Sequence, residues 1–245
     1  MTRMEKEKCF PRTGSIPISH SPKYWVKEKD RYLRQLLIHD IETLTGRPLC
    51  VYFAQLDQAI NHTDPDDLSE ILAGIKADEV DLFIQTPGGD VNATEKLISI
   101  LRQRLKSWRV IVPSWAKSAG TVIALSASEI VFGINSELGP IDPQIVTASG
   151  PFPCELLAND PQIPQHQRQL YSLFSERMKE LARRLLENGM MRGKKDKVDE
   201  LLAKIASTNG YKSHGAVIDA AEAKLLGLVT AFLKPDEKLA TLLYV

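Results

Sequence analysis

Apolar positions recur along the chain with two periods, which predict helices alternating with short strands. From Tyr24 to Thr45 the leucines and isoleucines follow helical spacing, and Gly46 and Pro48 stand where a helix ends. Short runs rich in Val, Ile and Phe then alternate with helical patterns. We expect strands at 49–53, 80–86, 109–113 and 130–133, with helices near 65–76, near 91–107 (Trp108 closing its apolar side) and from about 118. Repeated β-α units predict an α/β fold with a mainly parallel sheet covered by helices.

The second half of the chain is predicted to be mostly helical. A helix near 165–188 carries an apolar stripe, another follows near 195–207, and the ending "DAAEAKLLGLV" (219–229) comes after them. Between the halves, segment 146–165 holds several prolines and few helical signals. We expect either a lid or part of a subunit interface there, and a disordered surface loop is an equal alternative.

Domain organisation follows from length and composition. The chain has 245 residues, of which 43% are hydrophobic, enough for one large domain with a substantial core. Residues 1–22 contain three prolines and few large apolar side chains, so they are predicted to be poorly ordered. We expect a single domain over residues 23–245.

Charge and cysteine content exclude several classes of function. Lys+Arg and Asp+Glu each total 31, so no charge excess points to nucleic acid or to an anionic membrane surface. The three cysteines form no CxxC pair, and the histidines share no metal-ligand spacing, so we expect no disulfide framework, no metal and no cofactor. With neither a signal peptide nor a transmembrane segment in the sequence, the expected location is the cytoplasm.

Two strand-to-helix junctions carry residues suited to acyl transfer. In "QTPGGDV" (85–91), Gly88 and Gly89 leave backbone N–H groups uncovered, as an oxyanion hole requires. In "VPSWAKSAGT" (112–121), Ser118 stands at the start of a helix, where it serves either as a helix cap or as a nucleophile. Parallel strands bring both junctions to one edge of the sheet, so the N–H groups of Gly89 and Ala119 are predicted to meet beside Ser118.

Three blocks of the sequence resemble a known family. "TPGGDVNATEKLISIL", "IVPSWAKSAGTVIALSASEIVFGINSELGPIDPQI" and "SHGAVIDAAEAKLLGL" are similar to successive blocks of the serine dehydrogenase proteinase family, within the Clp-protease/crotonase superfamily related to signal peptide peptidase A. The resemblance covers roughly residues 30–230. It implies a Clp/crotonase-like spiral of β-β-α units, homo-oligomers and a serine peptidase in which Ser118 is the nucleophile and Gly89 and Ala119 donate to the oxyanion.

The base that activates the serine is left open by the sequence. A Clp-like His is missing, because "GPIDPQ" offers Asp142 in its place, and no lysine occurs between Lys117 and Lys179 where a Ser-Lys dyad needs one. His214, paired with Asp142 in a rearranged acid-base pair, is the first candidate. Lys179 is the second and Lys212 the third.

The sequence therefore predicts a serine endopeptidase that hydrolyses peptide bonds through a Ser118 acyl-enzyme. Two alternatives stay open. One is a catalytically silent scaffold or peptide-binding protein that keeps the fold without a base. The other is a crotonase-like enzyme that holds a CoA thioester between the same two amides and does not need the serine.

Overall fold

The central element of the computed structural model is a five-stranded parallel sheet with the strand order β1-β2-β3-β5-β9. The structure describes residues 22–243. Neighbouring strands of this sheet all run parallel, as the repeated β-α units predict. The strands are β1 Leu49–Phe53, β2 Glu79–Gln85, β3 Ser107–Val112, β5 Glu129–Phe132 and β9 Thr230–Phe232.

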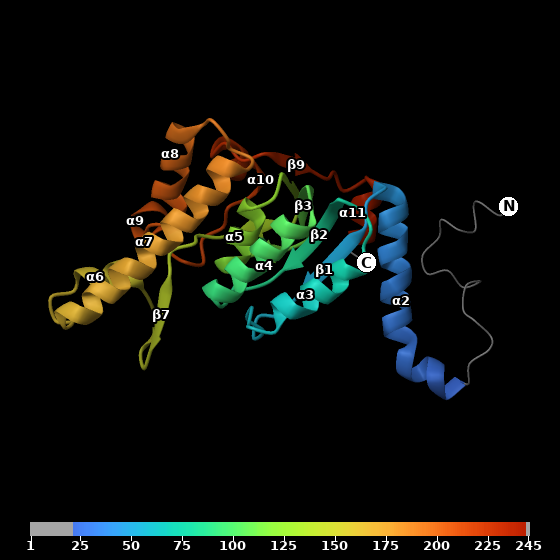
Figure 1. Cartoon of the computed structure of the whole chain (residues 1–245), viewed down its shortest axis with the longest axis horizontal. Coiled ribbons are helices and arrows are strands. Elements are labelled where there is room, and N and C mark those ends of the chain that lie inside the picture. Colours follow the sequence, from blue (N-terminus) through green and yellow to red (C-terminus); the bar gives the residue numbers. More distant parts are fainter. Residues whose placement is uncertain (1–21, 244–245) are drawn as a thin grey trace.

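Helices lie on both faces of the sheet, and α3, α4 and α5 lie along one of them (Figure 1). The helices are α2 Pro22–Thr45, α3 Asp64–Ala73, α4 Val91–Arg104, α5 Ala119–Leu125, α6 Cys154–Asn159, α7 Gln165–Asn188, α8 Lys195–Ile205, α9 Thr208–Tyr211, α10 Ala220–Leu225 and α11 Lys238–Leu243. Helix α7 has the bounds predicted from its apolar stripe. The predicted poorly ordered segment, 1–22, lies outside the described residues apart from Pro22, which begins α2.

Alternating side chains of each strand divide the apolar interior into two cores. On β3, Val110 and Val112 belong to the larger core with α4, α5, α7 and α8, whereas Ile111 belongs to a smaller core with α2 and α11. On β5, Phe132 and Val131 divide between the cores in the same way. The period-2 pattern therefore buries both faces of the sheet.

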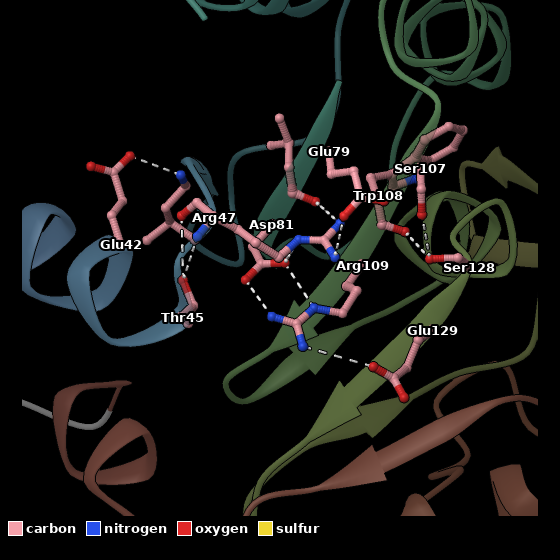
Figure 2. Close-up of polar contacts among 12 residues, drawn as sticks. Glu42, Thr45, Arg47, Glu79, Asp81, Ser107, Trp108, Arg109, Ser128 and Glu129 are labelled. Atoms are coloured by element: carbon pink, nitrogen blue, oxygen red, sulfur yellow. Dashed lines mark hydrogen bonds and ion pairs between the residues drawn. The ribbon is translucent and has the colours of Figure 1, made fainter. Parts of the chain in front are cut away.

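A buried ion-pair cluster lies on the α2 side of the sheet, near the amino ends of β2 and β3 (Figure 2). Asp81 is fully buried, and its carboxylate accepts hydrogen bonds of 2.9 and 2.7 Å from Arg109, its register partner on β3. Arg47 Nε lies 3.1 Å from the same carboxylate. The hydrogen bonds from Arg109 to Asp81 also raise the pKa of Arg109 above its ordinary value. Two guanidinium groups thus compensate one buried charge.

Helix α4 ends at Arg104, so the predicted helix to residue 107 is too long by three residues. Leu105 has an extended backbone, and the N–H groups of Lys106 and Ser107 donate to Asp78 O just before β2. Trp108, predicted to close the apolar side of the helix, lies instead within β3 and is buried in the larger core. Strand pairing with a distant segment overrides the helical periodicity at this point.

Segment 146–165 is ordered rather than a structureless loop. Strands β7 Gln144–Thr147 and β8 Gly150–Pro153 form an antiparallel hairpin, and α6 follows it directly. In Figure 1 the hairpin, α6 and the first part of α7 extend away from the sheet. Several apolar side chains in this part are exposed: Val146, Phe152, Leu156, Leu170, Leu173 and Phe174.

Candidate active site

Ser118 stands at the junction between the short strand β4 Trp115–Ala116 and helix α5. Its backbone has φ 52° and ψ −117°, a conformation that costs an L-residue free energy. It occupies the N-cap position of α5, yet its side chain makes no capping hydrogen bond. The hydroxyl is therefore not used as a cap, and the residue is only partly buried.

Hydrogen bonds on both sides hold the strained backbone of Ser118 in place. Lys117 N donates to Thr86 O at 3.0 Å, which ties β4 to the end of β2. Beyond the serine, Gly120 N donates to Lys117 O at 2.8 Å and Val122 N to Ser118 O at 3.2 Å. Fixed flanking residues of this kind keep a nucleophile exposed at a sharp strand-to-helix turn.

The Gly88-Gly89 turn lies directly against Ser118. A Cβ added to Gly88 would be 2.8 Å from Ser118 Cβ and 3.0 Å from Ala119 N, so only glycine allows this approach. Ile60 N donates to Gly88 O, and Asp90 N donates to Ile60 O. Because backbone groups alternate in direction along an extended segment, the Gly89 N–H between them points away from Ile60.

The N–H groups of Gly89 and Ala119 at this junction have no acceptor among residues 22–243. Ala119 is the first residue of α5, where helix N–H groups have no partner within the helix. The positive end of the α5 dipole lies at the same place. The arrangement is suited to a developing oxyanion on a carbonyl attacked by Ser118.

Asp142 and His214 form the hydrogen-bonded pair expected from the sequence. His214 Nδ1 lies 2.9 Å from Asp142 Oδ1, across 72 residues of chain. The Asp142 side chain is 5% exposed and that of His214 is 30% exposed. A buried carboxylate at Nδ1 orients the ring and leaves Nε2 for a second partner.

Lys117 links the serine segment to the two segments that carry this pair. Its ammonium donates to Leu138 O at 3.2 Å and to Ala216 O at 3.1 Å, and it lies 2.9 Å from the Glu137 carboxylate. These contacts place Ser118, Asp142 and His214 on adjoining segments. No hydrogen bond within the described chain joins Ser118 Oγ to either member of the pair, an arrangement common in enzymes without substrate.

The other candidate bases have different surroundings. Lys179 Nζ lies 4.0 Å from the Glu155 carboxylate. Its ammonium therefore forms an ion pair with an acid, and no hydrogen bond among the described residues joins it to Ser118. Burial raises the pKa of Glu155, but hydrogen bonds from Thr208 and Ser207 and the charge of Lys179 outweigh this effect and leave it below the usual value. Lys212 is exposed and lines a cavity together with His214.

Two residues that the sequence did not single out support the candidate site. Gln144 Nε2 donates to Asp142 Oδ2 at 2.6 Å, so both carboxylate oxygens have a donor. The spacing of two residues in an extended segment is the signal that pairs them. The hydroxyl of buried Thr121 donates to Ala116 O at 2.7 Å and accepts from Gly139 N at 3.1 Å, which fixes α5 to the segment before Asp142.

Comparison with known proteins assigns the chain to a family. The model of a family described as ClpP-like SDH-type serine proteinase matches residues 37–243. Uncharacterized protein MJ0137 of Methanocaldococcus jannaschii is 34% identical over 180 residues, 70% of this chain and 62% of the relative. Uncharacterized protein MJ1495 of the same organism is 35% identical over 123 residues, 48% of this chain and 39% of the relative. The chain thus matches less than two thirds of the length of either relative.

A solved structure shares the fold. ClpP1 from Listeria monocytogenes superposes with a TM-score of 0.50 and 18% identity, covering 82% of this chain and 96% of that one. The predicted Clp/crotonase-like α/β fold is therefore confirmed. Between residues 22 and 243 no helix is long and apolar enough to cross a membrane.

Proposed function

Because the chain belongs to the family of ClpP-like SDH-type serine proteinases, we propose that it is a serine endopeptidase with Ser118 as its nucleophile. The observation that carries the proposal is the hydroxyl of Ser118, which stands at a helix N-cap without capping it. The unpaired N–H groups of Gly89 and Ala119 and the Asp142–His214 pair support the same chemistry.

The proposed reaction follows from these groups. Ser118 Oγ bonds to the carbonyl carbon of the scissile peptide while its proton passes to Nε2 of His214, and the N–H groups of Gly89 and Ala119 bind the oxyanion. The C–N bond then breaks and the amine leaves with the proton. Water then hydrolyses the acyl-enzyme. Its oxygen bonds to the acyl carbon while one of its protons passes to His214, the ester C–O bond breaks, and His214 returns the proton to Ser118 Oγ.

We favour His214 as the base because its Nδ1 is held by a buried carboxylate. Lys179 lies beside the Glu155 carboxylate instead. An aspartate at Nδ1 stabilises the imidazolium that forms during attack. The proposal includes a peptide or protein substrate, assembly into a homo-oligomer, and a reducing compartment such as the cytoplasm, to which the free thiols of Cys50 and Cys154 are suited.

The test is labelling of the whole chain with a fluorophosphonate probe, together with cleavage of a fluorogenic peptide library. We expect the wild type to be labelled and Ser118→Ala to be unlabelled. His214→Ala is expected to lower the cleavage rate by about 10²- to 10⁴-fold, the usual contribution of a general base. Lys179→Ala, the matched control, should keep nearly the full rate.

Other outcomes favour other functions. Labelling that is equal in wild type and Ser118→Ala would contradict the proposal. Turnover of an acyl-CoA that survives Ser118→Ala would indicate a crotonase-like enzyme, and peptide binding without turnover would indicate a silent scaffold. Loss confined to Lys179→Ala or Lys212→Ala would assign the base to that lysine.

A further inference from the structure

A cavity of ≈ 490 Å³ lies beside the Asp142–His214 pair. Apolar surface comes from Pro151 and Pro153 on β8 and from Leu156 on α6. Polar side chains come from the segment that runs from α9 to His214. The cavity therefore joins a small apolar patch to a mostly polar lining, and convergent polar groups of this kind fix the orientation of a bound ligand.

The acidic groups in and behind these walls already have donors. Asp142 Oδ1 is paired with His214 and Asp142 Oδ2 accepts from Gln144. Glu155, on α6, accepts from both Ser207 and Thr208. No carboxylate is thus left over to attract a positively charged ligand.

Lys212 is the one Lys or Arg side chain in the cavity lining. No ion pair within the described chain compensates its charge, in contrast to Lys179, Lys117 and Lys204, which all have acidic partners. Its backbone is left-handed, with φ 57°, and its N–H donates to Thr208 O at 2.9 Å, so the residue caps α9. The fixed backbone keeps an unpaired cation at the rim of the cavity.

We propose that this cavity is a substrate subsite for a carboxylate, with Lys212 as the residue that determines this specificity. The inference rests on the proposed peptidase function, since the cavity shares His214 with that site. The carboxylate comes either from an acidic side chain or from the free carboxyl end of a peptide. Pro151, Pro153 and Leu156 would contact its aliphatic part while Lys212 supplies the charge.

Matched peptides test the subsite. A fluorogenic peptide is prepared with Glu or the isosteric Gln at each position around the scissile bond in turn, and with a free or an amidated carboxyl end. We expect wild type to favour one carboxylate peptide over its neutral match by about two- to fivefold in kcat/KM, the size of a partly exposed ion pair. A preference in the Glu series would identify an acidic side chain as the source of the carboxylate, and a preference in the free-carboxyl series would identify the peptide's carboxyl end.

Variants of Lys212 decide whether it is responsible. Lys212→Gln should abolish the preference, and Lys212→Arg should retain it. Lys212→Asn is a second neutral variant, and asparagine tolerates a left-handed backbone. It therefore tests the charge of Lys212 even where Lys212→Gln fails to fold. The control is Lys76→Gln, at an exposed lysine in the loop before β2, which should keep the full preference. A preference that survives both Lys212→Gln and Lys212→Asn, or that wild type lacks, would overturn the inference.

Two further readouts separate the inference from the proposed function. Fluorophosphonate labelling of the wild type reports on Ser118 and tests the peptidase without the subsite. Binding of the same labelled peptides to Ser118→Ala, measured by fluorescence anisotropy, tests the subsite without catalysis. Absent labelling with a retained carboxylate preference in binding would reject the peptidase and keep the subsite. Normal labelling of the wild type, with equal binding of the carboxylate and neutral peptides, would keep the peptidase and reject the subsite.

Discussion

Among the described residues other than glycine, Ser118 and Lys212 have a positive backbone φ. Such conformations persist where surrounding contacts hold them, and they concentrate at functional sites. Ser118 is held by bonds to the ends of β2 and α5, and Lys212 by its bond to α9. The two residues to which we assign chemistry and specificity thus carry the backbone strain of this part of the fold.

Gly88 provides a prediction at the residue scale. Gly88→Ala places a Cβ at 2.8 Å from Ser118 Cβ and 2.9 Å from Lys117 O, on a backbone with φ 104°. Because the Ser118 and Ala119 backbone must move, we expect fluorophosphonate labelling to slow by about a hundredfold, comparable to the loss of an oxyanion donor. The measurement is the labelling rate.

Gly46→Ala is the matched control for this prediction. Gly46 also has a positive φ, 70°, but a Cβ there meets nothing within 4 Å. This variant is expected to lose about 1–2 kcal/mol of unfolding free energy from backbone strain and to be labelled at the normal rate. Equal labelling of the two variants would refute the close approach of Gly88 to Ser118.

At the scale of elements, hydrophobic periodicity predicts most helices and strands, and it fails where pairing with a distant segment decides. Helix α7 matches its predicted bounds, and Met178, Leu181 and Leu185 of its stripe pack in the larger core, whereas the first part of the stripe is exposed. Helix α4 stops early because Asp78, far away in sequence, accepts from the next two N–H groups after Leu105. Periodicity within a window contains no information about such a partner.

The Asp81 cluster gives the prediction for the sheet. Asp81→Ala leaves Arg47 and Arg109 without their buried partner, and removing one member of a buried ion pair costs about 3–5 kcal/mol. Urea denaturation monitored by circular dichroism measures the loss. The control is Asp78→Ala, which breaks an exposed ion pair with Lys106 and should change stability little. A small loss for Asp81→Ala would mean that the cluster is not a structural anchor of β2 and β3.

At the scale of the whole molecule, the sequence predicts which residues form the candidate site better than how they meet. Parallel β-α order is sufficient to bring the Gly88 turn and Ser118 to one edge of the sheet. The Asp142–His214 pair depends on the path of 72 residues through α6, α7, α8 and α9. Local patterns do not encode that path, so the sequence names both residues without establishing their contact.

The two described cysteines report on the integrity of the whole fold. Burial, reinforced by Glu42, raises the pKa of Cys50 to about 11, and burial, reinforced by Asp142, raises that of Cys154 to about 11. At pH 8 roughly one thiol in a thousand is then ionised, against about a quarter for a free thiol.

In a Cys9→Ser background, the native protein is therefore expected to react with an aromatic disulfide reagent at least about a hundredfold more slowly than the same protein in urea. Absorbance of the released thiolate measures both rates. Rapid reaction in native buffer would show that these two side chains are not enclosed.

The bonds of Lys117 to Leu138 and Ala216 set the order in which activity can arise during synthesis. The bond to Ala216 joins residues 99 positions apart, and His214 lies on the same late segment. A ribosome must therefore synthesise the chain past Ala216 before Ser118 and its proposed base can meet. Under the proposed mechanism, the nascent polypeptide carries the serine without its base until that moment, so we expect a growing chain not to cut itself or its neighbours.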